Sequence, residues 1–298
     1  MTGDSGARLV QADEGRWATA TVVGRTARRI WAHPENRGVR GRRLARWVAW
    51  QGWQRVARRP WTIRWHGRLR LVCHPHDHVT TMAMYYGLYD REEMRFLLAW
   101  LRPGDTFLDV GANVAPYSLL ASSVSGARAV AFEPGTLARE RAAANVALNG
   151  AGDRVTLVPV AVSDRDGLAR LTADRWATNT LVDAAYDGQV EEVASVTLDS
   201  WAEATAVASV ALVKVDVEGH EERVLRGASG LLARDRPALI VELNDVGALR
   251  AFAADADYTL VRYAPGSGTL ASADWPDAPG GNVLLVPDLA RARARLER

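Results

Sequence analysis

Apolar and polar positions along the chain follow two alternating patterns, and the switches between them mark the expected elements. From about residue 90, short apolar runs typical of buried strands alternate with longer amphipathic stretches typical of helices. The strands are expected at 107–110, 129–132, 155–162, 210–217 and 238–243, and the helices at 91–101, 116–123, 136–148, 221–232 and 246–254. Strands separated by helices run parallel and are covered on both faces, so this pattern predicts an α/β fold.

Two pairs of segments break this alternation. Residues 168–171 and 190–198 have the pattern of an inserted antiparallel pair around a polar loop. Residues 258–263 and 282–286 have the pattern of a second pair, placed at the edge of the sheet. The sheet is therefore expected to be mostly rather than wholly parallel.

The first part of the chain has a different pattern. Residues 19–59 are largely helical in pattern, and residues 61–65 and 69–72 alternate as the two strands of a hairpin do. We therefore expect a helical and hairpin extension over residues 1–87, followed by a second domain over residues 88–298.

Charge is distributed unevenly between these two parts. Residues 1–70 hold 16 Arg and four acidic residues, whereas the remainder holds 21 basic and 31 acidic residues. The basic part also carries seven of the 11 Trp, and such side chains need apolar cover. We therefore expect the basic arm to pack on its own acidic body, and we expect no nucleic-acid or membrane partner.

Bulk composition excludes several classes of protein. Hydrophobic residues make up 48% of the chain, which is ample for a core and argues against disorder. No apolar run is long enough to cross a membrane, and no secretory signal pattern precedes the first helix. Cys73 is the only cysteine, so no internal disulfide can form. These features predict a cytoplasmic protein, and they leave open whether it forms a homodimer.

The most specific motif follows the first expected strand. It reads Asp109-Val110-Gly111-Ala112-Asn113, and the next strand ends at Glu133. Gly111 permits a close backbone approach, the following helix presents free N–H groups, and an acid in the place of Glu133 can bind two ribose hydroxyls. The spacing differs from the G-x-G-x-x-G turn of nicotinamide dehydrogenases, and Asp109 is placed to face a cation. The predicted ligand is a nucleoside that carries a cationic amino acid, as S-adenosylmethionine does; a capping turn without a ligand is the alternative.

A second cluster surrounds the only lysine of the chain, since every other strong base is arginine. Lys214, Asp216, Glu218 and His220 lie in or just after the expected strand at 210–217. Neighbouring carboxylates raise each other's pKa, and a nearby cation opposes this. We interpret these four residues as catalytic candidates, with Asp216 ranked first as the group that takes a proton from an acceptor hydroxyl. The alternative is a structural ion network that fixes the turn.

Two further groups could bind a metal. Asp216 with Glu242 and Asn244 offers the hard oxygen ligands that Mg²⁺ prefers, although a helix cap at Asn244 is an equally good explanation. His74, His76 and His78 would lie on one side of an extended strand, where three side chains rarely reach one ion. Metal dependence is left open on this basis.

Several motifs together resemble the FkbM-type family of S-adenosylmethionine-dependent methyltransferases. They include FLDVGANVAPYS (107–118) and LVKVDVEGHE (212–221), and they occur in the family's order over about residues 100–245. The remaining matches are at 131–134, 145–150, 160–164, 196–200 and 224–228. One departure is Ala115, where such families usually have a third glycine.

This resemblance implies a fold, a cofactor and an activity. The fold would be a Rossmann-like class I methyltransferase domain with a mostly parallel seven-stranded sheet. S-adenosylmethionine would be bound by Asp109, Gly111 and Asn113 at its amino-acid end, by Glu133 at the ribose, and by the backbone near Ala161 and Val162 at the adenine. The implied activity is O-methylation of a small molecule, either a sugar or a natural-product intermediate. N-methylation and a non-catalytic binding module are the alternatives.

Overall fold

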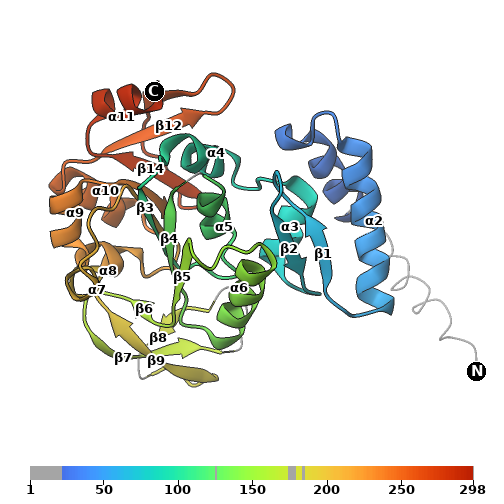
Figure 1. The fold of residues 1–298 in the computed structure, drawn as a ribbon, viewed down its shortest axis with the longest axis horizontal. Coiled ribbons are helices and arrows are strands. Elements are labelled where there is room, and N and C mark those ends of the chain that lie inside the picture. The colour runs from blue at the N-terminus through green and yellow to red at the C-terminus, as the bar shows by residue number, and fades with distance from the viewer. Residues whose placement is uncertain (1–21, 125, 174–178, 183–184, 298) are drawn as a thin grey trace, which may run out of the picture.

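In a computed structural model of the chain, the larger part is built around one eight-stranded sheet (Figure 1). The structure describes residues 22–124, 126–173, 179–182 and 185–297. In spatial order the strands are β13 (Thr269–Ser272), β12 (Thr259–Ala264), β14 (Asn282–Val286), β11 (Ala238–Glu242), β10 (Leu212–Val215), β3 (Thr106–Val110), β4 (Arg128–Phe132) and β5 (Val155–Val158).

The five strands from β11 to β5 pair in parallel, and the three at the other edge pair antiparallel. The α/β fold is confirmed, and the mostly parallel sheet is confirmed in part. The expected number of seven strands is wrong, because residues 269–272 fold back on β12 and add an eighth strand. The sequence around this hairpin is rich in Gly, Ala and Pro, so its short strand has no clear apolar pattern.

Helices cover both faces of the sheet. Alternate residues of each strand point to opposite faces, so Phe107 and Leu212 pack with one layer while Leu108 and Val213 pack with the other. The first layer contains α4 (Arg91–Trp100), α5 (Pro116–Ser123), α6 (Thr136–Leu148) and α11 (Leu289–Leu296). The second layer contains α7 (Leu198–Thr205), α8 (Glu221–Arg226), α9 (Ser229–Asp235) and α10 (Val246–Asp255).

The inserted segments form a small sheet of their own beside the main one. Its order is β6 (Ala161–Val162), β9 (Val190–Val196), β7 (Gly167–Thr172) and β8 (Leu181–Val182). The expected antiparallel pair is confirmed as β7 with β9. This sheet continues directly from the end of β5, so it stands over the carboxyl edge of the main sheet.

The N-terminal extension lies to one side of the main sheet (Figure 1). Residues 22–32 are helical. They are followed by the 3-10 turn η1 (Pro34–Asn36), α2 (Arg40–Val56), the antiparallel hairpin β1 (Trp61–Arg64) and β2 (Arg70–Cys73), and α3 (His78–Tyr86). The boundary predicted at residue 87 falls in the link between α3 and α4, and the separate folding of the two parts stays a prediction. Within the described residues, no helix is long and apolar enough to span a membrane.

The extension is joined to the body by packing and by hydrogen bonds. Trp47, Trp50 and Trp65 are buried in a core cluster that runs on into the body. Asn145 of α6 accepts the N–H of Val72 at 2.9 Å and donates to the carbonyl of Val114 at 3.1 Å, which ties β2 to the loop before α5.

The ion pairs across this boundary have the opposite polarity to the one expected. Glu35 of the extension pairs with Arg91 and Arg95 of the body at 3.1 and 2.7 Å, and Asp77 pairs with Arg141 at 3.5 Å. The extension therefore contributes acids to these contacts, and they do not use its many arginines.

His74, His76 and His78 do not share one side of a strand. Strand β2 ends before them, and His76 has a φ of 65° within a turn. Helix α3 then starts at His78, because the side chain of Asp77 accepts the N–H of Thr80 at 3.1 Å and caps the helix. The expectation of an extended polar strand is therefore wrong.

Candidate active site

A cavity opens at the carboxyl ends of β3, β4 and β10, where α/β sheets bind their ligands. It begins beside Val79 and Asp90 at the edge of the extension and passes over the loop after β3. It ends under Leu171 and Leu181 of the inserted sheet. The cavity is therefore walled by the body, the extension and the insertion together.

Three residues of the loop after β3 have a left-handed backbone conformation, with positive φ. Gly111, Asn113 and Ala115 have φ values of 78°, 51° and 63°. A Cβ atom on Gly111 would lie 1.8 Å from the carbonyl oxygen of Asp216, so only glycine fits between the two strand ends. Gly111 thus brings the two predicted motifs together, besides leaving room for a ligand.

Asp109 lies at the base of the cavity and is only 1% exposed. Its Oδ2 accepts hydrogen bonds from the backbone N–H and the hydroxyl of Ser118 at 3.0 and 2.6 Å. Its Oδ1 is buried and has no hydrogen-bond partner among the described residues. Burial raises the pKa of Asp109, and the nearby charge of Lys214 opposes the rise. A cationic donor placed in the cavity would satisfy the remaining oxygen.

Glu133 stands at the end of β4 on the same wall. Its two carboxylate oxygens accept the N–H groups of Asn113 and Gly135, each at 2.8 Å. Burial raises the pKa of Glu133 to about 7, while these two hydrogen bonds oppose the shift. Each oxygen keeps a second lone pair, so the carboxylate is held in place and can still accept hydroxyl donors.

The far end of the cavity is apolar. Ala161 and Val162, expected beside the adenine, both line it and are each 3% exposed. Leu171 and Leu181 of the inserted sheet cover this end. The insertion was predicted from the sequence as an antiparallel pair around a polar loop, and Asn179 of that loop also lines the cavity.

The other end of the cavity is strongly charged and centres on Lys214. Register places Lys214 beside Asp109 on the neighbouring strand, and its Nζ lies 2.7 Å from Oδ2 of Asp216. The ammonium also lies 4.7 Å from the ring centroid of Tyr117, whose hydroxyl donates to Asp90 at 2.9 Å. Burial alone would lower the pKa of Lys214, but the carboxylates of Asp216, Asp109 and Asp90 outweigh burial and raise it.

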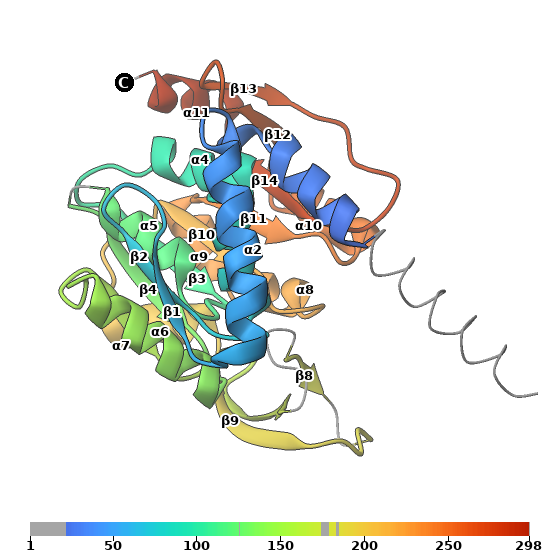
Figure 2. The same ribbon diagram turned by 90° about the vertical axis from the view of Figure 1, so that its right-hand side faces the viewer.

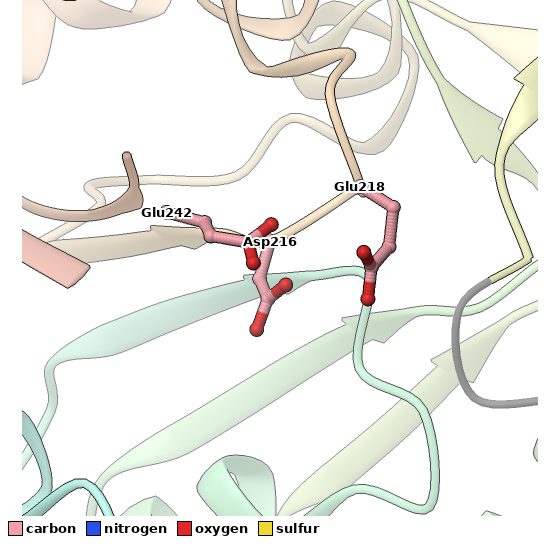
Figure 3. Close-up of side chains that lie close together, drawn as sticks. All are labelled: Asp216, Glu218 and Glu242. Atoms are coloured by element: carbon pink, nitrogen blue, oxygen red, sulfur yellow. The ribbon is translucent and has the colours of Figure 1, made fainter. Parts of the chain in front are cut away.

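Three carboxylates meet at the ends of β10 and β11 (Figure 3). Asp216, Glu218 and Glu242 can each offer an oxygen within 4.8 Å of the others. Burial and the charge of Asp216 raise the pKa of Glu242 to about 7, and burial and the same charge raise the pKa of Glu218. Glu218 also has a φ of 54°, a strained backbone of the kind found at functional sites.

The oxygens of this trio fit a divalent cation in type, because Mg²⁺ prefers carboxylates. Asn244 was expected to contribute as a ligand. Its Nδ2 instead donates to Oε2 of Glu242 at 2.7 Å, so it supports the carboxylate.

His220 and Glu221 lie further into the turn. Nε2 of His220 lies 2.9 Å from the hydroxyl of Ser163, and the ring does not line the cavity. Glu221 accepts the N–H groups of Val217 and Gly219 at 3.1 and 3.0 Å, so it fixes the turn. The structure therefore brings Lys214, Asp216 and Glu218 together in the cavity and leaves His220 outside it.

Two residues of this network were not singled out in the sequence. Asp90 precedes α4, and Tyr117 lies in the first turn of α5. Asp90 belongs to no motif, and Tyr117 lies in the 107–118 motif without a role that the sequence assigns; the packing of α4 against α5 brings both to Lys214.

Comparison with known proteins agrees with this geometry. A family model described as the methyltransferase FkbM domain matches residues 109–260. The chain belongs to the FkbM methyltransferase family. The matched region contains Asp109, Glu133, Lys214, Asp216 and Glu242, whereas α4 and the whole extension precede it.

Individual relatives are distant. The chain is 29% identical over 182 residues to the 31-O-demethyl-FK506 methyltransferase FkbM of Streptomyces tacrolimicus, covering 50% of this chain and 69% of the relative. It is 29% identical over 150 residues to the hexuronic acid methyltransferase AglP of Haloferax volcanii, covering 48% and 58%. A solved structure of methyltransferase FkbM from Methylobacillus flagellatus is 16% identical, with a TM-score of 0.43, and covers 70% of this chain and 55% of that one. The chain thus spans less than two thirds of the last two proteins.

Proposed function

We propose that this methyltransferase takes its methyl group from S-adenosylmethionine and transfers it to a hydroxyl of a small molecule, such as a sugar or a natural-product intermediate. The observation that carries the proposal is the buried Oδ1 of Asp109, which has no hydrogen-bond partner among the residues that the structure describes. An unsatisfied buried carboxylate oxygen is costly, and an ammonium group in the cavity would remove that cost.

The groups along the rest of the cavity follow the order of the parts of S-adenosylmethionine, and so support the same ligand. Asp109 would accept the amino group, Glu133 would accept the ribose hydroxyls, and the apolar end at Ala161 and Val162 would hold the adenine. When bound, S-adenosylmethionine supplies an electrophilic methyl group on a positively charged sulfur. Three carboxylates, those of Asp216, Asp109 and Asp90, surround the single ammonium of Lys214, so a cationic ligand is favoured in the cavity.

The charged end of the cavity would hold the acceptor. Asp216 is fixed by the ammonium of Lys214 at 2.7 Å, and its side chain remains 32% exposed. It can therefore orient an incoming hydroxyl and receive its proton, and Glu242 lies beside it as a carboxyl with a pKa of about 7. A binding module would not need acids of this kind beside its ligand, which favours catalysis.

Transfer to oxygen is supported by the name of one relative, which refers to an O-demethylated compound. The other relative is named for a hexuronic acid, which offers both hydroxyl and carboxyl oxygens. N-methylation is the second candidate, because the same carboxylates could hold an amine.

Calorimetric titration tests the cofactor directly. The protein should bind S-adenosylmethionine and show no binding of NAD. Asp109→Asn should weaken the binding of S-adenosylmethionine, whereas the control Asp153→Asn, at an exposed position, should not. Binding of NAD with none of S-adenosylmethionine would contradict the proposal.

Transfer of labelled methyl to a panel of matched hydroxyl and amino sugars then tests the acceptor, and labelling of the amino sugars alone would favour N-methylation.

A further inference from the structure

Among the described residues, no element covers the side of α2 that faces away from the body. Figure 2 looks onto this helix, with no other element in front of it. Its exposed residues occupy one continuous arc at 100° per residue. We call this arc the outer face; its members are Gly41, Arg42, Ala45, Val48, Ala49, Gly52, Trp53, Arg55 and Val56.

The middle of the outer face is apolar and its flanks are basic. Val48 and Val56 are 61% and 87% exposed, and Trp53 is 43% exposed. Arg55 lies at one side of the strip, while Arg42 and Trp53 lie at the other. Helices with this distribution lie in the plane of a membrane surface, with the apolar strip among the acyl chains and the arginines at the headgroups.

Positive charge around this face is not compensated. Glu35 is the only acid between residues 22 and 76, and it is already paired with Arg91 and Arg95. The exposed arginines of the helical part are Arg25, Arg28, Arg29, Arg37, Arg42, Arg55, Arg58 and Arg59. Within the described residues none of them has a carboxylate within ion-pair distance, so the surface is complementary to an anionic partner.

Other partners fit this face less well. The body already packs on the opposite side of α2, through Trp47 and Trp50. A second copy packed on the same face would bring two surfaces rich in exposed arginines together, and like charges would repel. Nucleic acid would use the arginines but would leave an exposed strip of Val, Ala and Gly without a role.

Contrary to the expectation from the sequence that no membrane partner exists, we propose that the outer face docks this protein on a membrane surface that contains anionic lipid. The helix lies along the interface, Val48 and Val56 enter the acyl region, and the flanking arginines contact lipid phosphates. The sequence predicted that the tryptophans would be covered by the body. Trp47 and Trp50 are buried in the core, whereas Trp53 is exposed and would lie at the lipid interface. This inference does not rest on the proposed cofactor or acceptor.

Vesicle co-sedimentation of the full-length protein tests the proposal. We expect binding to vesicles of phosphatidylglycerol and phosphatidylcholine, little binding to phosphatidylcholine alone, and weaker binding as salt is raised. The triple variant Arg42→Glu, Arg55→Glu, Arg59→Glu should lose at least about a hundredfold in vesicle affinity. Its matched control is Arg128→Glu, Arg154→Glu, Arg250→Glu, which changes the net charge equally at exposed positions of the body and should retain most binding.

A second variant separates apolar insertion from charge. Val48→Ser with Val56→Ser keeps the charge and the exposed positions, and should weaken vesicle binding by roughly tenfold. Unchanged melting temperatures show that the variants are folded. No binding to anionic vesicles, equal losses in both arginine triples, or full binding by the serine variant would each overturn the proposal. Retention on DNA or RNA that depends on Arg42, with no vesicle binding, would instead assign the face to nucleic acid.

Discussion

The two halves of the carboxyl edge of the main sheet hold their acidic side chains in opposite ways. At the ends of β3 and β4, Asp109 and Glu133 are held by donors from Ser118, Asn113 and Gly135, most of them backbone N–H groups. At the ends of β10 and β11, Asp216, Glu218 and Glu242 face one another (Figure 3). In the first half, hydrogen bonds that come mostly from the backbone hold the acids. In the second half, the acids face one another, and their mutual charge dominates.

This difference indicates which half can change with the substrate. Donors of the backbone are independent of side-chain identity, so the first half, where the cofactor is proposed to bind and which we call the cofactor half, suits a ligand that does not vary. We call the second half, around Asp216, the acceptor half. Like charges held close need a proton, a cation or a substrate to stabilise them, so the acceptor half is completed by what binds there. Lys214 lies between the halves, beside Asp109 and paired with Asp216.

The largest effect is expected from removing that lysine. Lys214→Met leaves the acids on both sides without their buried counter-charge, which should lower the free energy of unfolding by about 3–5 kcal/mol. Urea denaturation followed by circular dichroism measures this. The double variant Lys214→Met with Asp216→Asn should recover part of the loss, because it removes the charge that the lysine pairs with at 2.7 Å. A double variant no more stable than the single one would show that Asp216 is not the main partner.

On the cofactor half, Glu133→Ala should weaken binding of S-adenosylmethionine by about 2–4 kcal/mol, since charge-assisted hydrogen bonds to the ribose are lost. The chain should still fold, which the melting temperature checks. A dissociation constant equal to that of the unmodified protein in calorimetry would exclude the ribose assignment.

The same residue predicts a dependence on pH with a definite sign. The pKa of Glu133 is raised to about 7 from 4.5, so its carboxylate, the better hydroxyl acceptor, forms as pH rises through about 7. Cofactor affinity should therefore increase over this range, whereas the contribution of Glu133 to the stability of the free protein declines from about pH 4.5 to 7. Glu133→Gln should remove this part of the pH dependence, and an identical pH profile in the variant would assign it to another group.

The cofactor half could be predicted from the sequence more fully than the acceptor half. Asp109 lies near the end of a strand, and Gly111 and Glu133 follow strands, whose apolar pattern is clear, so their places at the sheet edge follow from strand order. Glu242 was anticipated as a metal ligand, but its pKa and its nearness to Glu218 depend on a strained turn. Asp90 lies near Lys214 and accepts a hydrogen bond from Tyr117 because α4 packs against α5, a tertiary contact between helices that no local pattern encodes.

Boundaries between elements show the same limit. The helix expected at 221–232 is divided into α8 and α9 at Gly227, where a Cβ would lie 2.1 Å from the carbonyl oxygen of Ser163. The expected strand at 155–162 is divided into β5 and β6, which belong to different sheets. In both cases a contact with a distant segment overrides a continuous apolar pattern.

On the acceptor half, Asp216→Asn should reduce turnover by roughly a hundredfold and leave binding of S-adenosylmethionine little changed. The amide keeps the shape of the side chain but cannot take the proton of a hydroxyl. Steady-state assays with the acceptor found by labelling measure the loss. His220→Ala serves as the comparison and should retain most activity, because the ring contacts Ser163 outside the cavity.

A chelator distinguishes the two roles open to Asp216. Inactivation of the unmodified protein by EDTA, reversed by Mg²⁺, would show that the three carboxylates act through a cation. Full activity in EDTA would leave proton transfer as their role. Normal turnover of Asp216→Asn together with an inactive His220→Ala would contradict the ranking of Asp216 above the histidine.

The smallest effect is expected at Ala115, where the resemblance to FkbM-type sequences implies a glycine. Its φ of 63° costs an L-residue about 1–2 kcal/mol, which glycine would avoid. Ala115→Gly, however, also removes a buried methyl worth about 0.8 kcal/mol and adds about 0.4–1 kcal/mol of unfolded-chain entropy. These effects nearly cancel, so stability should change by less than about 1 kcal/mol, whereas Ala115→Val should be clearly destabilising because a β-branched residue resists positive φ. Cofactor affinity that rises strongly in Ala115→Gly would show that the alanine narrows the loop, and the cofactor half would then be less fully organised than its hydrogen bonds indicate.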